Sequence, residues 1–270
     1  SAYGILTVFE AIPPREGQPK AGAEARRALE LDETLPTAHV QLGFYQLNYL
    51  WDFAGALKSF ERAVDLHPSS SAALHGLATA LVVHGRFDEA LARMKRATEV
   101  DPLWLLASAD LCTFLYFERR YDAAIAQCRK TLEMEPDFPP ALYYLTEIYE
   151  TLGRDDDVYR SYRKLLPLMG VSSENMARNE AAYAAGGWKA VAKRWLEVQL
   201  AERKKRPLPA FSIAESYRRL GEREAALDWL EKACDERHFE VVFLKVSPKF
   251  DSLRSHPRFE RLLKRMGLAT

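Results

Sequence analysis

The sequence has no apolar run close to the roughly 20 residues that a helix needs to cross a bilayer. It also lacks the charged start and apolar core of a signal peptide. Its 38 Lys and Arg residues balance 38 Asp and Glu residues, so the molecule has no overall field that would attract a polyanion. We therefore expect no membrane segment and no direct nucleic-acid partner. Because the chain begins at Ser1 rather than at Met, we expect it to be a fragment.

Cysteine is scarce. Cys112, Cys128 and Cys234 are odd in number, lie far apart and form no CxxC pair. This pattern indicates small buried hydrophobic residues of a reducing compartment rather than a redox or metal site. We accordingly expect a cytoplasmic protein.

Motifs that would carry catalysis are also missing. The chain contains no HExxH, no GxxxxGK[ST], no GxGxxG after a strand and no GxSxG. The acidic run at 154–159, RDDDVY, lacks the alternating ligands and the glycine of a calcium loop. The basic run at 202–207, ERKKRP, is typical of a helix C-terminus stopped by proline. We predict no catalytic, cofactor-binding or metal-ligating residue, and no cofactor.

What the sequence does contain is a repeat of 34 residues. Prolines recur at positions 68, 102 and 136, and alanines at 90, 124, 192 and 226. Glycines stand at positions 85, 153, 187 and 221, with Arg119 in the missing place. The glycines are expected to end the first helix of each unit in a left-handed turn, and the prolines to end the second helix.

This spacing and these residue types carry the tetratricopeptide pattern, in which each repeat is a pair of antiparallel helices. One unit shows it well, and its signature positions are Leu42, Gly43, Ala56, Phe60 and Pro68, with one extra residue near Trp51. The small residues stand where the two helices of a hairpin cross closely. We predict an all-α, right-handed α-solenoid of tetratricopeptide hairpins with a C-terminal helical cap.

The phase of the pattern predicts repeats at 36–69, 71–104, 105–138, 139–172, 173–206 and 207–238. A further, degenerate repeat precedes them, with its first helix near residues 2–12 and a long loop at 13–20; the repeat at 173–206 is degenerate too. The array of about seven hairpins thus spans residues 1–238. Residues 239–270 form a capping segment of the same structural unit.

The first helices of the hairpins should line the concave side of such an array. We name the following fifteen residues the first-helix lining and predict that they bind a protein or peptide: Val40, Phe44, Leu47, His75, Thr79, Val83, Thr113, Tyr116, Phe117, Tyr143, Glu147, Glu150, Phe211, Arg218 and Arg219. The alternative is that the aromatic residues are core between hairpins and the charges are solvated surface.

The tail, KVSPKFDSLRSHPRFERLLKRM at 245–266, holds seven Lys or Arg against two Asp or Glu. Phe259, Leu262, Leu263 and Met266 nevertheless form one apolar stripe at helical spacing. We therefore interpret the tail as a cap on the last hairpin. We expect Phe250, Leu253, Phe259 and Leu263 to pack on the helix that contains Trp229 and Leu230.

The C-terminal part resembles the closing segment of tetratricopeptide regions in large bacterial regulatory proteins. The matching residues are Leu220, Gly221, Ala226, Trp229 to Ala233, Arg237, Pro248, Phe250, Asp251, Leu253, Arg254, Pro257, Arg258 and Phe259. Ser247 and His256 depart from the acidic residues usual there. In those proteins the region follows a winged-helix DNA-binding domain, a serine/threonine kinase domain or an adenylate cyclase domain. The resemblance implies a sensory or scaffold part detached from its effector.

Three functions remain open from the sequence. The leading hypothesis is a noncatalytic module that binds a protein or peptide and passes that state to an attached regulatory domain. The second is a structural or self-associating solenoid, a homodimer in which the lining is unused. The third is an enzyme whose site the motifs do not reveal.

Overall fold

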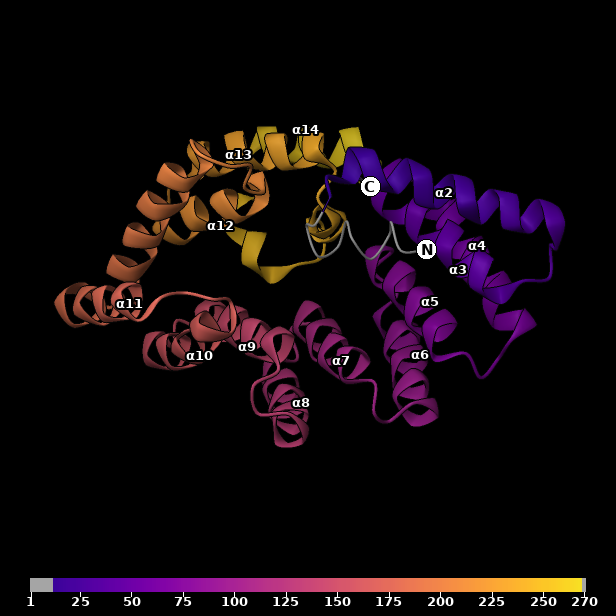
Figure 1. Cartoon of the computed structure of the whole chain (residues 1–270), viewed down its shortest axis with the longest axis horizontal. Coiled ribbons are helices and arrows are strands. Elements are labelled where there is room, and N and C mark those ends of the chain that lie inside the picture. Colours follow the sequence, from indigo (N-terminus) through magenta and orange to yellow (C-terminus); the bar gives the residue numbers. More distant parts are fainter. Residues whose placement is uncertain (1–11, 269–270) are drawn as a thin grey trace. The chain divides into compact units, whose positions relative to one another are not determined.

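The computed structural model describes residues 12–268, and the regular secondary structure in that range is helical. The helices follow one another in antiparallel pairs, as α5 and α6 do in Figure 1. The prediction of an all-α fold built from helical hairpins is confirmed. The predicted helix near residues 2–12 lies almost wholly outside the described residues.

The chain forms two compact units. Among the described residues, the first unit holds 12–107, 233–246 and 257–268, and the second holds 108–232 and 247–256. Each unit therefore combines a run of hairpins with a piece of the C-terminal segment. The predicted division into an array at 1–238 and a cap at 239–270 stays a prediction.

The first unit begins with α2 (Pro14–Leu31), which packs on α3 (Pro36–Tyr45). The elements that follow are η1 (Gln46–Leu50), α4 (Phe53–Leu66), α5 (Ser71–Val83) and α6 (Phe87–Val100). The predicted loop at 13–20 is wrong, because α2 already begins at Pro14. Proline suits the first turn of a helix, where its missing N–H needs no partner, and Pro19 removes only one further bond.

The extra residue near Trp51 is accommodated by η1, which is a π-helical turn. A π-turn takes one more residue than an α-turn, so the insertion leaves the hairpin intact. Trp51 then ends the turn in the left-handed conformation, with φ of 59°.

The C-terminal pieces of the first unit pack on its N-terminal helices. They comprise the end of α13 (Arg223–Glu236), η2 (Phe239–Phe243), which contacts η1, and α14 (Pro257–Met266). The side chain of Arg15 donates to the carbonyl oxygen of Asp235 at 2.8 Å, and Arg265 pairs with the Asp235 carboxylate at 2.6 Å. In the same unit, Cys234 Sγ lies 3.6 Å from Met266 Sδ.

The second unit contains α7 (Leu105–Phe117) from Ser108 onward, α8 (Tyr121–Met134), α9 (Pro139–Thr151), α10 (Asp155–Leu168), α11 (Ser173–Arg203), α12 (Ala210–Leu220), most of α13, and η3 (Pro248–Leu253). In α11, Gly186 and Gly187 break the helical conformation. The long helix is thus two helices of one hairpin, joined where the glycine ladder predicts a turn. Arg119, in the missing place of the glycine ladder, also has a positive φ, of 62°.

Two of the three cysteines do not behave as predicted. Cys112 on α7 and Cys128 on α8 form a disulfide, with Cα atoms 5.5 Å apart. Cys112 stands at a small-residue position of α7, and Cys128 stands on α8 in the place that Phe60 holds in the earlier repeat. The Cα separation lies in the range that a disulfide requires. A disulfide is typical of an oxidising compartment. The premise that Cys112 and Cys128 are unpaired is therefore wrong. The expectation of a reducing compartment, which rests on that premise, loses its support.

Candidate functional site

The fifteen residues of the first-helix lining are all buried or half-buried. Six belong to the first unit and nine to the second. In the first unit they pack within and between hairpins: the Phe44 ring meets Phe60 of the same hairpin edge-on at 4.9 Å, and lies 6.1 Å from the His75 ring of the next hairpin. Leu47 is fully buried. These contacts agree with a core role for the aromatic residues of this unit.

In the second unit the lining brings charges together. Glu147 and Glu150 stand one turn apart on α9, and Arg218 and Arg219 stand at the end of α12. Arg218 pairs with Glu150 at 2.7 Å, and Arg219 pairs with Glu147 at 2.5 Å and with Glu150 at 3.2 Å. Their side chains are at most 13% exposed. The charges on these two helices are therefore buried ion pairs and not solvated surface.

Two more charges complete this group. Glu215, one turn before Arg219 on α12, accepts a hydrogen bond from Lys249, and the Lys249 ammonium lies 3.3 Å from Glu147. Lys249 comes from η3, and its side chain is 7% exposed. We call these six residues the charge cluster: Glu147, Glu150, Glu215, Arg218, Arg219 and Lys249.

The electrostatics of the cluster keep its groups ionised. Burial by itself raises the pKa of Glu147, but Lys249, Arg219 and Arg218 together outweigh burial and lower that pKa to about 2. Burial likewise opposes ionisation of Glu150, yet the two arginines lower the pKa of its carboxyl group. Burial would lower the pKa of Arg219, and the surrounding carboxylates raise it well above its ordinary value.

Aromatic side chains enclose the cluster and bond to it. The Tyr143 hydroxyl donates to Glu215 at 3.2 Å, and the Trp188 indole N–H donates to Glu150 at 3.0 Å. The Tyr116 hydroxyl lies 2.8 Å from that of Thr151. Burial is the main reason that the pKa of the Tyr116 hydroxyl is raised above its ordinary value.

Three buried polar atoms of the lining have no hydrogen-bond partner in the described part of the chain. They are Thr113 Oγ1, Glu147 Oε2 and Arg218 Nε, of which Glu147 Oε2 still lies 3.3 Å from the Lys249 ammonium. Buried polar atoms of folded proteins nearly always have a partner, so such exceptions mark hydrogen-bonding capacity that the fold does not use.

Sequence reasoning missed the part played by η3. It placed Glu147, Glu150, Tyr143, Arg218 and Arg219 in the lining, and the structure brings these five together. It assigned Lys249 only to a basic tail, because nothing local indicates that this lysine meets α9 about a hundred residues earlier. The Phe250 ring lies edge-on to Phe211 of α12, with ring centres 6.1 Å apart. Its expected packing on the helix of Trp229 stays a prediction. Phe250 thus lies beside the charge cluster, with its ring centre 5.6 Å from the Lys249 ammonium.

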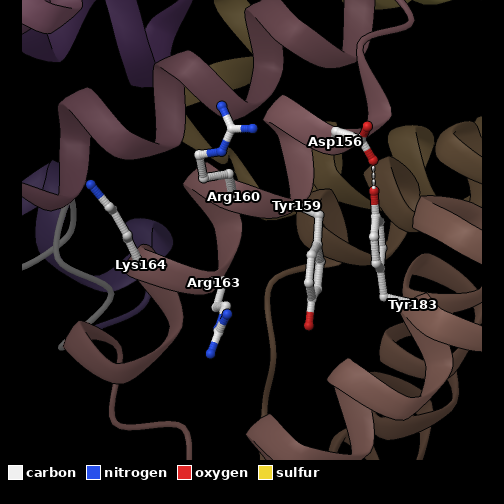
Figure 2. Close-up of a pocket in the computed structure, with 6 residues that line it drawn as sticks. All are labelled: Asp156, Tyr159, Arg160, Arg163, Lys164 and Tyr183. Carbon is white, nitrogen blue, oxygen red and sulfur yellow. Dashed lines mark hydrogen bonds between the residues drawn. The ribbon is translucent and has the colours of Figure 1, made fainter.

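A shallow pocket of about 560 Å³ lies elsewhere in the second unit, between α10 and α11 (Figure 2). Tyr159 and Tyr183 stack face to face at 3.8 Å, and the Tyr183 hydroxyl donates to Asp156. This bond is the main reason that the pKa of Tyr183 is raised to about 12. The cations Arg160 and Arg163 are paired with carboxylates. The pocket is thus a set of satisfied surface side chains, and we assign it no role.

Within residues 12–268, no three His, Cys, Asp or Glu side chains gather as a metal site would require. In the same range, no helix is both long and apolar enough to span a membrane. The charge cluster presents carboxylates, guanidinium groups and an ammonium group that are already joined by ion pairs and hydrogen bonds.

Comparison with known proteins identifies the repeats. Family models of the tetratricopeptide repeat match residues 52–110 and 210–237. No curated protein matches the chain in sequence.

Several solved structures resemble the fold. One is PilW, described as a widely conserved type IV pilus biogenesis factor, with a TM-score of 0.54 and 16% identity over 97% of this chain and 99% of that chain. Another comes from the APC/C hetero-tetramer Cut9–Hcn1, with a TM-score of 0.54 and 15% identity over 92% of this chain and 46% of that chain. A third is YrrB, a tetratricopeptide protein, with a TM-score of 0.44 and 15% identity over 82% of this chain and 95% of that chain.

Identities this low show the fold alone. Residues 52–110 and 210–237 carry tetratricopeptide repeats, and the fold is an all-α solenoid of the tetratricopeptide type.

Proposed function

We propose that this chain is a noncatalytic interaction module that binds a protein or peptide segment through the first helices of its hairpins. The supporting observation is the charge cluster, in which η3, a short segment outside the hairpins, docks on α9 and α12 through Lys249. Tetratricopeptide arrays generally use the first helices of their repeats in this way, as extended surfaces for partner segments.

Packing between hairpins gives no reason for such a cluster. Six buried charges lose their hydration, and replacement of buried ion pairs by apolar side chains is often neutral or stabilising. An array that needed only a core would be served by leucine at these positions. Charged and aromatic groups that face a short docked segment are instead suited to selecting one segment over another.

A random-peptide display library, selected on the full chain, tests this proposal. We expect enriched peptides whose affinity drops at least tenfold in a Tyr143→Ala variant, because Tyr143 is a half-buried residue of the lining. Arg163→Ala is the matched control on the exposed face of α10 and should leave binding unchanged. Peptides that bind both variants equally well would place recognition outside the first helices.

We also propose that the module is the sensory or scaffold part of a larger bacterial regulator. The support is the resemblance of the C-terminal segment, at Trp229, Arg237, Pro248 and Phe250 among other residues. The coding sequence immediately upstream of Ser1 tests this. A DNA-binding, kinase or cyclase domain encoded in frame there would support the role, and a stop codon followed by an unrelated gene would contradict it.

A further inference from the structure

Residues 247–256 are the middle part of the predicted capping segment at 239–270. We call these ten residues the cap segment, and they occupy the first-helix surface of the second unit. Its central turn, η3, contacts α9. Arg119, at the end of α7, holds Asp251 with two contacts of 2.9 Å, and Glu224 of α13 lies 2.9 Å from His256. A segment from the C-terminal end of the chain thus lies against the helices that the proposed function assigns to a partner.

Lys249 balances the charge of this surface. Without it, α9 and α12 contribute three carboxylates, Glu147, Glu150 and Glu215, and two guanidinium groups, so one negative charge remains uncompensated. An uncompensated buried charge is strongly unfavourable. The surface therefore favours an occupant that carries one cation.

The same surface also accommodates an aromatic ring beside the cation. The Lys249 ammonium lies 5.0 Å from the centre of the Phe211 ring and 5.7 Å from that of Tyr143. Phe250 is 1% exposed and packs edge-on against Phe211. Lysine and phenylalanine in sequence thus fill two adjoining positions, one lined by carboxylates and the other by an aromatic ring.

The ion pairs that Asp251 and His256 of the cap segment form with Arg119 and Glu224 are weaker. Arg119 and Asp251 are 48% and 44% exposed, and Glu224 is 68% exposed. Ion pairs in water contribute only about 0 to 1 kcal/mol each. Most of the binding free energy of the segment therefore resides in its buried side chains, which include Lys249, Phe250 and Leu253, as in interfaces where a few buried anchors dominate.

We propose that the α9–α12 surface recognises a lysine–aromatic pair, that Lys249 and Phe250 are its built-in occupant, and that a partner segment with the same pair displaces them. This inference rests on the proposed function and names its partner class, a peptide segment with a lysine followed by an aromatic residue. The intramolecular occupant has a high effective concentration, so a partner succeeds when it adds contacts of its own or when the cap segment is weakened.

The test uses the full chain and two synthetic peptides. One peptide has the sequence of residues 245–256, KVSPKFDSLRSH, and the other carries methionine in place of its second lysine. Affinities are measured by titration calorimetry for the wild type and for Lys249→Met, with Lys264→Met, an exposed lysine on α14, as the matched control. We expect the lysine peptide to bind Lys249→Met at least tenfold more tightly than it binds the wild type or the control. The methionine peptide should show no such gain.

Equal affinity of the lysine peptide for all three proteins, or an equal gain for both peptides, would overturn the inference. If Lys249→Met does not fold, the inference is tested by measuring amide hydrogen exchange of the wild type with and without each peptide. Excess lysine peptide should speed exchange at residues 247–254, and excess methionine peptide should not; unchanged exchange with both would also overturn it. Library peptides that depend on Tyr143 but lack a lysine–aromatic pair would leave the proposed function standing and refute only this inference.

Discussion

The guanidinium group of Arg237 lies 3.5 Å above the ring of Trp51. Both residues hold left-handed backbone conformations, with φ of 58° and 59°, although neither is glycine. Arg237 ends α13 and Trp51 ends η1, so this stack joins two ends of the first unit that are far apart in sequence. The side-chain contact gives a physical reason for arginine at a position whose backbone favours glycine.

Replacing Arg237 by alanine should destabilise the chain by about 1 to 2 kcal/mol, because a partly desolvated cation–π contact contributes about that much. The measurement is urea unfolding followed by circular dichroism. Arg119→Ala is the control: Arg119 has the same left-handed backbone, with φ of 62°, but its partner Asp251 is exposed. It should lose about 1 kcal/mol at most. Equal losses in both variants would mean that the stack on Trp51 contributes no more than an exposed ion pair, which would contradict the prediction.

Reduction of the Cys112–Cys128 disulfide should lower the free energy of unfolding by about 3 kcal/mol, since the bond closes a loop of 16 residues in the unfolded chain. Urea unfolding with and without reductant measures this. Thiol titration of the denatured chain provides a direct check, with one reactive thiol expected before reduction and three after it. Three thiols in the unreduced protein would refute the disulfide.

Acid should weaken the second unit through Glu147. The pKa of its carboxyl group is about 2 in the folded chain and 4.5 for the free side chain. Ionised Glu147 therefore adds to the free energy of unfolding above pH 4.5, and this added stability is lost as pH falls towards 2. The loss is on the order of 3 kcal/mol. We expect Glu147→Gln to have a lower free energy of unfolding than the wild type at pH 7. The difference between the two proteins should narrow as pH falls from 4.5 towards 2. A difference in unfolding free energy that stays constant from pH 5 to pH 2.5 would contradict the buried ion pairs. Glu197→Gln, at an exposed position, serves as the control.

Enlarging Gly43 should strain the hairpin around Phe60. A Cβ atom at Gly43 would lie 2.7 Å from the Phe60 ring, and one at Gly76 would meet the same ring. Gly43→Ala should therefore cost about 1 to 3 kcal/mol by overpacking. In a Phe60→Leu background the cost should shrink, as a double-mutant cycle of unfolding free energies would show. An identical cost in both backgrounds would rule out this contact as the cause.

The hairpins were predictable because their determinants are local. Gly85, Gly153, Gly187 and Gly221 all have the positive φ that the 34-residue ladder predicts, and Arg119 has it in the missing place. A helix, its cap and the next turn depend on residues within a few positions of one another. The loop predicted at 13–20 is wrong, because Pro14 stands at a helix start.

The site was predictable only in part. The phase of the repeat placed Glu147, Glu150, Arg218 and Arg219 on first helices, but their charges were compatible with solvent as well as with burial. Whether they are buried depends on partners 68 to 72 residues away, and no local pattern encodes that distance.

The sequence by itself thus determined the helical hairpins, their period and the residues that face along the first helices, because periodicity expresses the geometry of single helices and neighbouring turns. Only the tertiary structure decided that Cys112 bonds to Cys128, that Arg237 stacks on Trp51 and that Lys249 enters the charge cluster. These contacts join segments whose approach is set by how the hairpins pack, and packing is a property of the folded chain rather than of any short stretch of it.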